Sequence, residues 1–132
     1  MGGRYRLGDL QLAIMRVLWE HREATVAEVH AALHPERGLA LTTIATMLRK
    51  LEAKRLLNHR VRGRRFVFRP RVSQRAVRRS MVADLLDRLF EGDAAALVSH
   101  LLTERLIGQE EVARLKAMIE SPQRGEGLRR DR

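Results

Sequence analysis

Residues 57–70 alternate apolar and basic side chains around a single glycine, and this pattern restricts the fold more than any other part of the chain. One set is Leu57, His59, Val61, Phe66 and Phe68. The residues that alternate with it are Asn58, Arg60, Arg62, Arg65, Val67 and Arg69. A period of two on both sides of Gly63 predicts a β-hairpin with a basic tip. Phe66 and Phe68 are expected in the core.

Two amphipathic helices are predicted in the first forty residues. Residues 10–21 place Leu10, Ile14 and Leu18 at helical spacing. The sequence 25–28 begins with Thr25 and ends with Glu28, the pattern of a capping box, so a second helix is expected from about Val26. Residues 34–38, which include a proline and a glycine, are expected to end it.

A third helix is predicted from Thr42 or Thr43 to about Lys54, because apolar residues recur on one face at spacings of three and four. Its opposite face lacks carboxylates, whereas an ordinary solvated face mixes charges of both signs. Threonine is also a poor helix former, so helix propensity does not explain this face. It carries Thr42, Thr43, Thr46, Arg49 and Lys50.

Three helices followed by a basic hairpin predict a mainly α protein with a small β-hairpin, a winged helix–turn–helix, to which residues 24–26 add a third strand. Ser73 is expected to cap a further helix that runs to about Phe90, followed by helices over 94–107 and from Gly108. We expect a DNA-binding domain over 1–71, a three-helix dimerisation domain over 72–120 and a disordered tail over 121–132.

The net charge of +10 is concentrated in one part of the chain. Residues 49–79 hold thirteen basic side chains and one acid, Glu52, whereas the residues before them sum to zero and those after them to −2. A generally basic protein would spread its charge, so this local excess indicates a polyanionic partner, most often nucleic acid.

These features predict how the chain binds double-stranded DNA. The recognition helix of a helix–turn–helix enters the major groove, where threonine and basic side chains contact base edges. The hairpin arginines are better placed for the phosphate backbone or the minor groove. They are Arg60, Arg62, Arg64 and Arg65.

The helical tail carries more aliphatic surface than three short helices can bury alone. A second copy would cover it, and a two-fold dimer would match a dyad-symmetric operator. The alternative is that the tail packs on its own winged helix. The residues expected at the dimer interface are Leu85, Leu86, Leu89, Phe90, Leu97, Val98, Leu101 and Leu102.

Other functional classes find little support in the sequence. The absence of cysteine excludes thiolate metal sites, and His30 and His34 lack a third ligand, so we expect solvated histidines, no metal and no cofactor. Asp84 and Asp87 are interpreted as a charged solvated face, and no catalytic motif occurs, so an enzyme is not expected.

The longest uncharged runs have about ten residues, too few to cross a bilayer, and no signal peptide is evident, so a cytoplasmic protein without membrane insertion is expected. The alternative function is a basic winged-helix module for RNA binding or protein interaction. Exposed aromatic residues are typical of RNA recognition, and the expected burial of Phe66 and Phe68 argues against it.

The segments 7–21 (LGDLQLAIMRVLWEH), 42–57 (TTIATMLRKLEAKRLL) and 58–70 (NHRVRGRRFVFRP) together resemble the penicillinase-repressor family, the BlaI/MecI/CopY-type winged-helix repressors. The resemblance covers about residues 7–120 and implies a homodimeric repressor on dyad-symmetric promoter DNA. Thr43 and Thr46 match family positions that touch bases. Thr42 stands where the family has a lysine.

The resemblance also implies how the repressor is released from DNA. In the family, a transmembrane zinc-protease sensor leads to cleavage within the dimerisation domain, and that region falls around Ser99, His100 and Leu101 here. A copper-responsive branch carries a C-terminal cysteine cluster, which this chain lacks.

Overall fold

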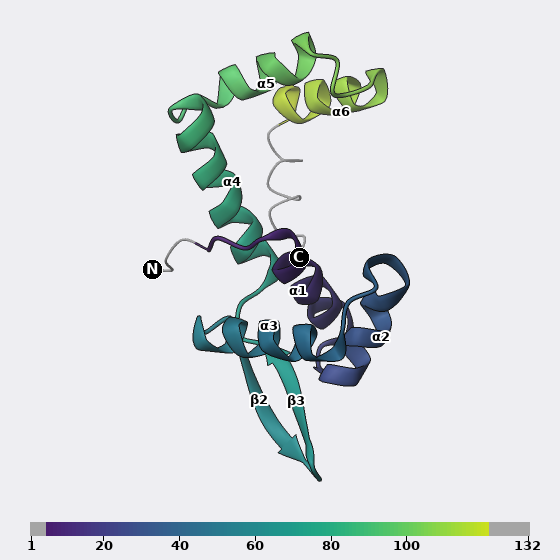
Figure 1. Cartoon of the computed structure of the whole chain (residues 1–132). Coiled ribbons are helices and arrows are strands. Elements are labelled where there is room, and N and C mark those ends of the chain that lie inside the picture. Colours follow the sequence, from purple (N-terminus) through teal and green to yellow (C-terminus); the bar gives the residue numbers. More distant parts are fainter. Residues whose placement is uncertain (1–4, 122–132) are drawn as a thin grey trace. The chain divides into compact units, whose positions relative to one another are not determined.

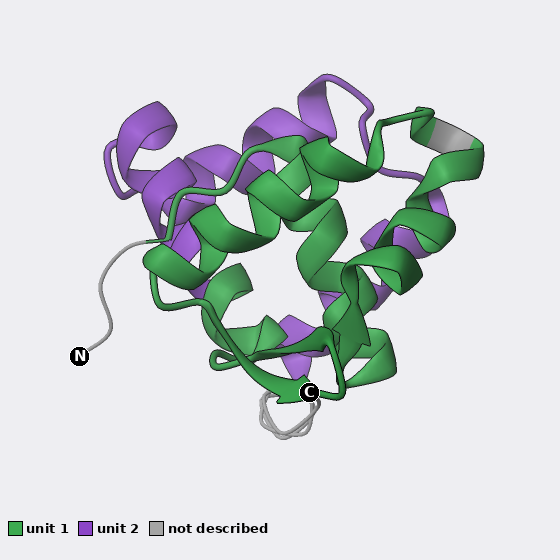
Figure 2. Ribbon diagram, turned by 60° about the horizontal axis from the view of Figure 1, so that its bottom comes forward, with its two compact units in different colours: residues 1, 3–78 green, residues 2, 79–132 purple. Residues whose placement is uncertain are grey.

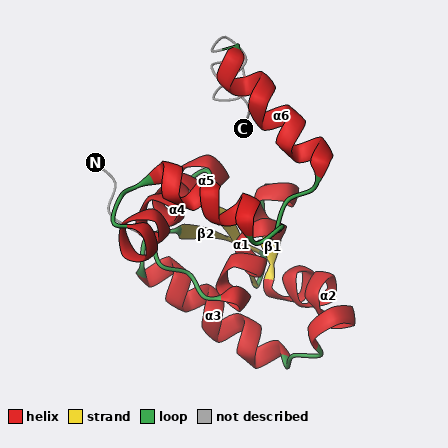
Figure 3. Cartoon of the chain, turned by 90° about the horizontal axis from the view of Figure 1, so that it is seen from above, coloured by secondary structure: helices red, strands yellow, loops and turns green. Residues whose placement is uncertain are grey.

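The structure is a computed structural model that describes residues 5–121, so most of the predicted tail, 122–132, lies outside the described residues. Within this range the chain forms six helices and three strands (Figure 3). It divides into two compact units, the first ending at Arg78 and the second beginning at Arg79 (Figure 2). None of the helices in this range is long and apolar enough to cross a membrane.

Unit 1 is a three-helix body with a three-stranded antiparallel sheet, the predicted winged helix with its additional strand. Strand β3 is central, with β1 on one side and β2 on the other. Its elements are α1 (Asp9–His21), β1 (Ala24–Thr25), α2 (Val26–Arg37), α3 (Leu41–Ala53), β2 (Leu57–Arg62), β3 (Arg65–Pro70) and the first residues of α4 (Gln74–Phe90). In Figure 1, α3 crosses the base of the β2–β3 hairpin, and the hairpin tip extends beyond it.

The core of unit 1 forms where the apolar faces of its helices meet the base of the sheet. Ile14 and Leu18 of α1, Ile44 and Leu48 of α3, and Phe68 of β3 are almost completely inaccessible to solvent. A hydrogen bond from Trp19 Nε1 to the Val72 carbonyl (2.9 Å) ties α1 to the chain that leaves the sheet. The positions of α3 and the hairpin are therefore set by one shared core.

The capping box at the start of α2 is confirmed. Thr25 Oγ1 accepts a hydrogen bond from the Glu28 N–H (3.2 Å), and the Thr25 N–H donates to Glu28 Oε1 (2.8 Å). The predicted end of this helix within residues 34–38 is confirmed, because α2 ends at Arg37. The proline lies in the last turn, and the helix ends where Gly38 adopts a left-handed conformation (φ 59°).

The burial of the hairpin also differs from the prediction in one respect. Phe68 is buried, but Phe66 is 44% exposed, so its assignment to the core is wrong. The reason is the length of β1, which pairs with β3 only at Phe68 and Val67. From Phe66 to the turn at Gly63, β3 pairs with β2 alone, outside the three-stranded part of the sheet.

Unit 2 contains the rest of α4, α5 (Ala94–Thr103) and α6 (Gln109–Glu120). Asp93 caps α5 by accepting the Ala96 N–H (3.0 Å), and α5 and α6 contain no buried residue. The interpretation of Asp84 as part of a solvated face is wrong. Its side chain is buried, with Oδ2 3.3 Å from Arg88 Nη1.

Candidate nucleic-acid interface

Helix α3 presents a polar face opposite the core, which we call the outward face of α3. The core side is fixed by Ile44, Leu48 and Leu51, which have no exposed surface. The structure places Thr42, Thr46, Arg49 and Lys50 in solvent and leaves Thr43 half-buried. Exposed hydroxyl, methyl and cationic groups at this spacing can contact the edges of successive base pairs.

The single acid of the basic segment does not interrupt this face. Glu52, in the last turn of α3, directs its carboxylate to strand β2, where Oε2 lies 2.5 Å from His59 Nδ1. The sequence placed His59 only in the alternating set of the hairpin, and the structure shows that it joins α3 to the hairpin. The carboxylate is thereby held between α3 and the hairpin.

The β2–β3 hairpin with its turn, here called the wing, has two different faces. Because directly paired residues of antiparallel strands point to the same face, the pairs Arg62–Arg65 and Arg60–Val67 define one face. The pairs Val61–Phe66 and His59–Phe68 define the other. The first face is cationic and the second apolar.

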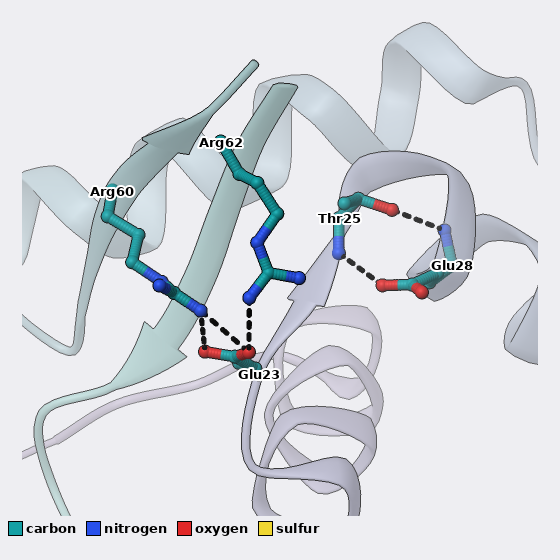
Figure 4. A network of polar contacts seen from close by, with 5 residues as sticks. All are labelled: Glu23, Thr25, Glu28, Arg60 and Arg62. Carbon is teal, nitrogen blue, oxygen red and sulfur yellow. Dashed lines mark hydrogen bonds and ion pairs between the residues drawn. The ribbon is translucent and has the colours of Figure 1, made fainter. Parts of the chain in front are cut away.

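Two of the four predicted wing arginines are paired with an acid. Arg60 Nη2 lies 3.0 and 2.9 Å from the two carboxylate oxygens of Glu23, and Arg62 Nη2 lies 3.8 Å from Glu23 Oε2 (Figure 4). Glu23 lies between α1 and β1, and the pairing of β1 with β3 brings it to this face. Sequence reasoning missed this residue.

The other two wing arginines, Arg64 and Arg65, are exposed at and beside the turn. Arg65 acts electrostatically on the start of α2. The pKa of Glu28 is lowered from its usual value of 4.5, mainly by its hydrogen bond with the Thr25 backbone and also by the cation of Arg65.

The apolar face of the wing reaches solvent near the tip. Val61 is 61% exposed and Phe66 is 44% exposed, and the Phe66 ring stacks on His59 with centroids 4.1 Å apart. Alternation alone places these side chains on one face, but it does not show where burial stops. The pair was therefore not recognised as surface.

Of the histidine pair of α2, His34 is exposed as expected, whereas His30 is half-buried. The rings of His30 and His34 lie 5.1 Å apart, and His30 Nε2 is 2.8 Å from the Leu39 carbonyl oxygen. Across residues 5–121, no group of three or more His, Asp or Glu side chains could hold a metal ion.

The residues predicted at a dimer interface fall on α4 and α5 of unit 2. Four are exposed, namely Leu85, Leu89, Val98 and Leu102, and four are half-buried, namely Leu86, Phe90, Leu97 and Leu101. In the predicted cleavage region, Ser99 and His100 are exposed on α5 and Leu101 is half-buried.

Comparison with known families identifies relatives over most of the chain. A family model described as Penicillinase repressor matches residues 7–121. The Penicillinase repressor of Bacillus licheniformis is 29% identical over 115 residues, which cover 87% of this chain and 90% of that protein. Transcriptional regulator BlaI of Mycobacterium tuberculosis is 49% identical over 53 residues, which cover 39% of this chain and 38% of that protein.

Unit 1 also has a solved structural relative. The solution structure of the DNA binding domain of the repressor BlaI is 34% identical to this chain, with a TM-score of 0.50. The match covers 56% of this chain and 90% of that domain.

Proposed function

This chain belongs to the penicillinase repressor family and is a BlaI-type transcriptional repressor that binds operator DNA, and from that premise we propose that it acts as a homodimer on a dyad-symmetric operator. The family consists of repressors, and the chain is not an enzyme.

The outward face of α3 supports the assignment of sequence readout to this helix. One side of α3 is held in the core by three fully buried aliphatic residues, while Thr42, Thr46, Arg49 and Lys50 are free to meet a partner. In this proposal Thr43 and Thr46 contact base edges through hydroxyl and methyl groups, and Arg49 and Lys50 contact guanine or phosphate. This cation-bearing face without carboxylates is the observation that carries the proposal.

The wing supplies affinity in this proposal. Arg64 and Arg65 are exposed at its tip, and Arg60 and Arg62 share the acid Glu23. Phosphate contacts of this kind hold the protein in register but do not distinguish sequences. Within the predicted DNA-binding domain over 1–71, α3 and the wing therefore have separate tasks.

The exposed leucines of unit 2 support a dimer formed through the predicted domain over 72–120. Helix α5 is rich in leucine and alanine yet contains no buried residue, and Leu89 of α4 is 68% exposed. A monomer rarely keeps such apolar surface in water. A second copy packed on α4 and α5 would cover it and would place two α3 helices on one operator.

Sedimentation of the full chain tests the dimer. Leu89→Glu should produce a monomer, because a carboxylate would be buried in the interface. Asn58→Asp, which adds the same charge at an exposed position of unit 1, should remain a dimer. A Leu89→Glu protein that sediments like the wild type would refute this interface.

We place the release step in unit 2 as well. Ser99 and His100 are exposed on α5, so a membrane sensor-protease system has a reachable segment between α4 and α6. Cleavage there would divide the proposed dimer interface. A chain with a specific protease site inserted after Ser99 should lose duplex binding when cut, and retention of the dimer after cutting would contradict this step.

An RNA-binding function is the second candidate, because Phe66 is exposed rather than buried and aromatic side chains stack on RNA bases. Two observations favour duplex DNA. The cations and threonines lie on a helix of the size that fits a major groove, and Phe66 already stacks on His59. Competition between duplex DNA and structured RNA separates the two functions, and preferential binding of RNA would overturn the DNA assignment.

A further inference from the structure

The tip of the wing carries an apolar pair that the proposed readout does not use. Val61 of β2 and Phe66 of β3 face each other directly across the two strands. They are 61% and 44% exposed, although hairpin pairing and the His59 ring already cover part of their surface. Large apolar side chains at such a site can bury further surface against a partner.

The orientation of the apolar face of the wing indicates from which side a partner would bind it. His59 lies on the same face as Val61 and Phe66, and its ring is bonded to Glu52 of α3. The apolar face is therefore the one turned toward α3. The opposite face carries Arg60 and Arg62 with their shared acid Glu23, as Figure 4 shows.

A helix in the major groove and a hairpin beside it are separated by one sugar–phosphate strand, because the groove is only about 12 Å wide. The face of the wing that looks toward α3 then meets this strand. Deoxyribose rings are the apolar part of the DNA backbone and alternate with anionic phosphates. The tip of the wing matches this backbone, because the apolar pair Val61 and Phe66 lies next to exposed cations. These cations are Arg62, Arg64 and Arg65.

We propose that Val61 and Phe66 pack against deoxyribose rings of the backbone strand between the major groove occupied by α3 and the neighbouring minor groove. This inference rests on the proposed DNA-binding function and adds an apolar contact surface to it. Apolar side chains also contact DNA in minor-groove proteins, where they insert between base steps. The contact is independent of base sequence.

An apolar contact with DNA and an arginine–phosphate contact differ in how their contribution to binding depends on salt. Phosphate contacts release counterions, so each one steepens the dependence of binding on salt. Burial of Val61 and Phe66 releases no counterion. Loss of these side chains should therefore weaken binding by the same factor at every salt concentration and leave the slope of log K against log salt unchanged.

The experiment measures binding of the full chain to a mixed-sequence DNA duplex across about 50 to 200 mM salt. Val61→Thr keeps the size and β-branching of valine and introduces a hydroxyl, so the strand should form as before. We expect about two- to fivefold weaker binding for Val61→Thr and about three- to tenfold for Phe66→Thr. Val61→Ile, which enlarges the apolar surface, should bind at least as tightly as the wild type.

Two control variants in the wing complete the design. Asn58→Thr changes an exposed residue of β2 on the other face and should leave affinity unchanged. Arg64→Gln should flatten the salt slope. Thermal melting of each variant is recorded, and all binding is measured well below the melting midpoint.

Each outcome decides between the proposal and its alternatives. Unchanged affinity of Val61→Thr and Phe66→Thr, or a change confined to the salt slope, overturns the proposal. Equal losses for Val61→Thr and Val61→Ile would contradict an apolar contact, because isoleucine enlarges the apolar surface. A changed oligomeric state of Val61→Thr without DNA would mean that the pair contacts protein. A wild-type chain that does not bind the duplex would instead refute the DNA-binding function itself.

Discussion

Glu23 is expected to oppose DNA binding, because it occupies two arginines that the wing would otherwise offer to phosphates. Its carboxylate oxygens lie 2.9 and 3.0 Å from Arg60 Nη2, and Oε2 lies 3.8 Å from Arg62. Binding of a phosphate to Arg60 must displace this carboxylate. Glu23→Gln removes the charge while it keeps the size of the side chain, so it should strengthen binding.

The expected magnitude follows from the exposure of the pair. The Arg60 and Glu23 side chains are 46% and 36% exposed, so the interaction is screened by solvent and is worth at most about 1 kcal/mol. That corresponds to a gain of up to about fivefold in affinity for each protomer. If Arg60 then gains one phosphate, the slope of log K against log salt should steepen by about 0.9.

The assay is a titration of a mixed-sequence duplex at several salt concentrations, with Glu20→Gln as the matched control. Glu20 is an exposed acid of α1, so this control makes the same change in net charge. The gain from Glu23→Gln should also shrink in an Arg60→Gln background, because the two residues act as a pair. Weaker binding by Glu23→Gln, or a gain no larger than that of Glu20→Gln, would refute the reasoning.

Two further predictions concern the helix cap and the wing. Thr25→Ala should lower the free energy of unfolding by about 0.5–2 kcal/mol, since it removes the side chain that accepts the Glu28 N–H, and chemical denaturation measures this loss. The pKa of Glu28 is lowered in the folded chain, so its carboxylate stabilises the fold above about pH 4.5 and this contribution disappears as pH falls further. The stability difference between wild type and Glu28→Gln should therefore be constant near neutral pH and shrink in acid, and a difference that grew in acid would contradict the sign. Arg64→Gln should weaken duplex binding at low salt more than at high salt, and parallel salt dependences would show that this arginine is not on a phosphate.

The sequence was sufficient to predict those parts of unit 1 that depend on local patterns. The capping box at Thr25, the helical spacing around Ile44 and Leu48, and the turn at Gly63 each involve residues close together in the chain. Even the two-residue strand β1 could be anticipated, because it lies directly before a recognisable helix start.

The features that were missed depend on how far one element extends past another. Phe66 and Phe68 have the same alternation, but only Phe68 lies where β1 completes the sheet. Glu23 lies 37 residues from Arg60 in the chain, and no local pattern predicts that the β1–β3 pairing brings them together.

The central claim is that the threonine-bearing outward face of α3 distinguishes DNA sequences. The most direct measurement compares wild type and Thr46→Ala for binding to a duplex from a footprinted site in the protein's own promoter and to a mixed-sequence duplex at one salt concentration. Thr46 is exposed on α3 and carries no charge, so its loss should weaken binding to the promoter site and leave binding to the mixed sequence nearly unchanged. An equal loss on both duplexes, or no loss on either, would contradict the account.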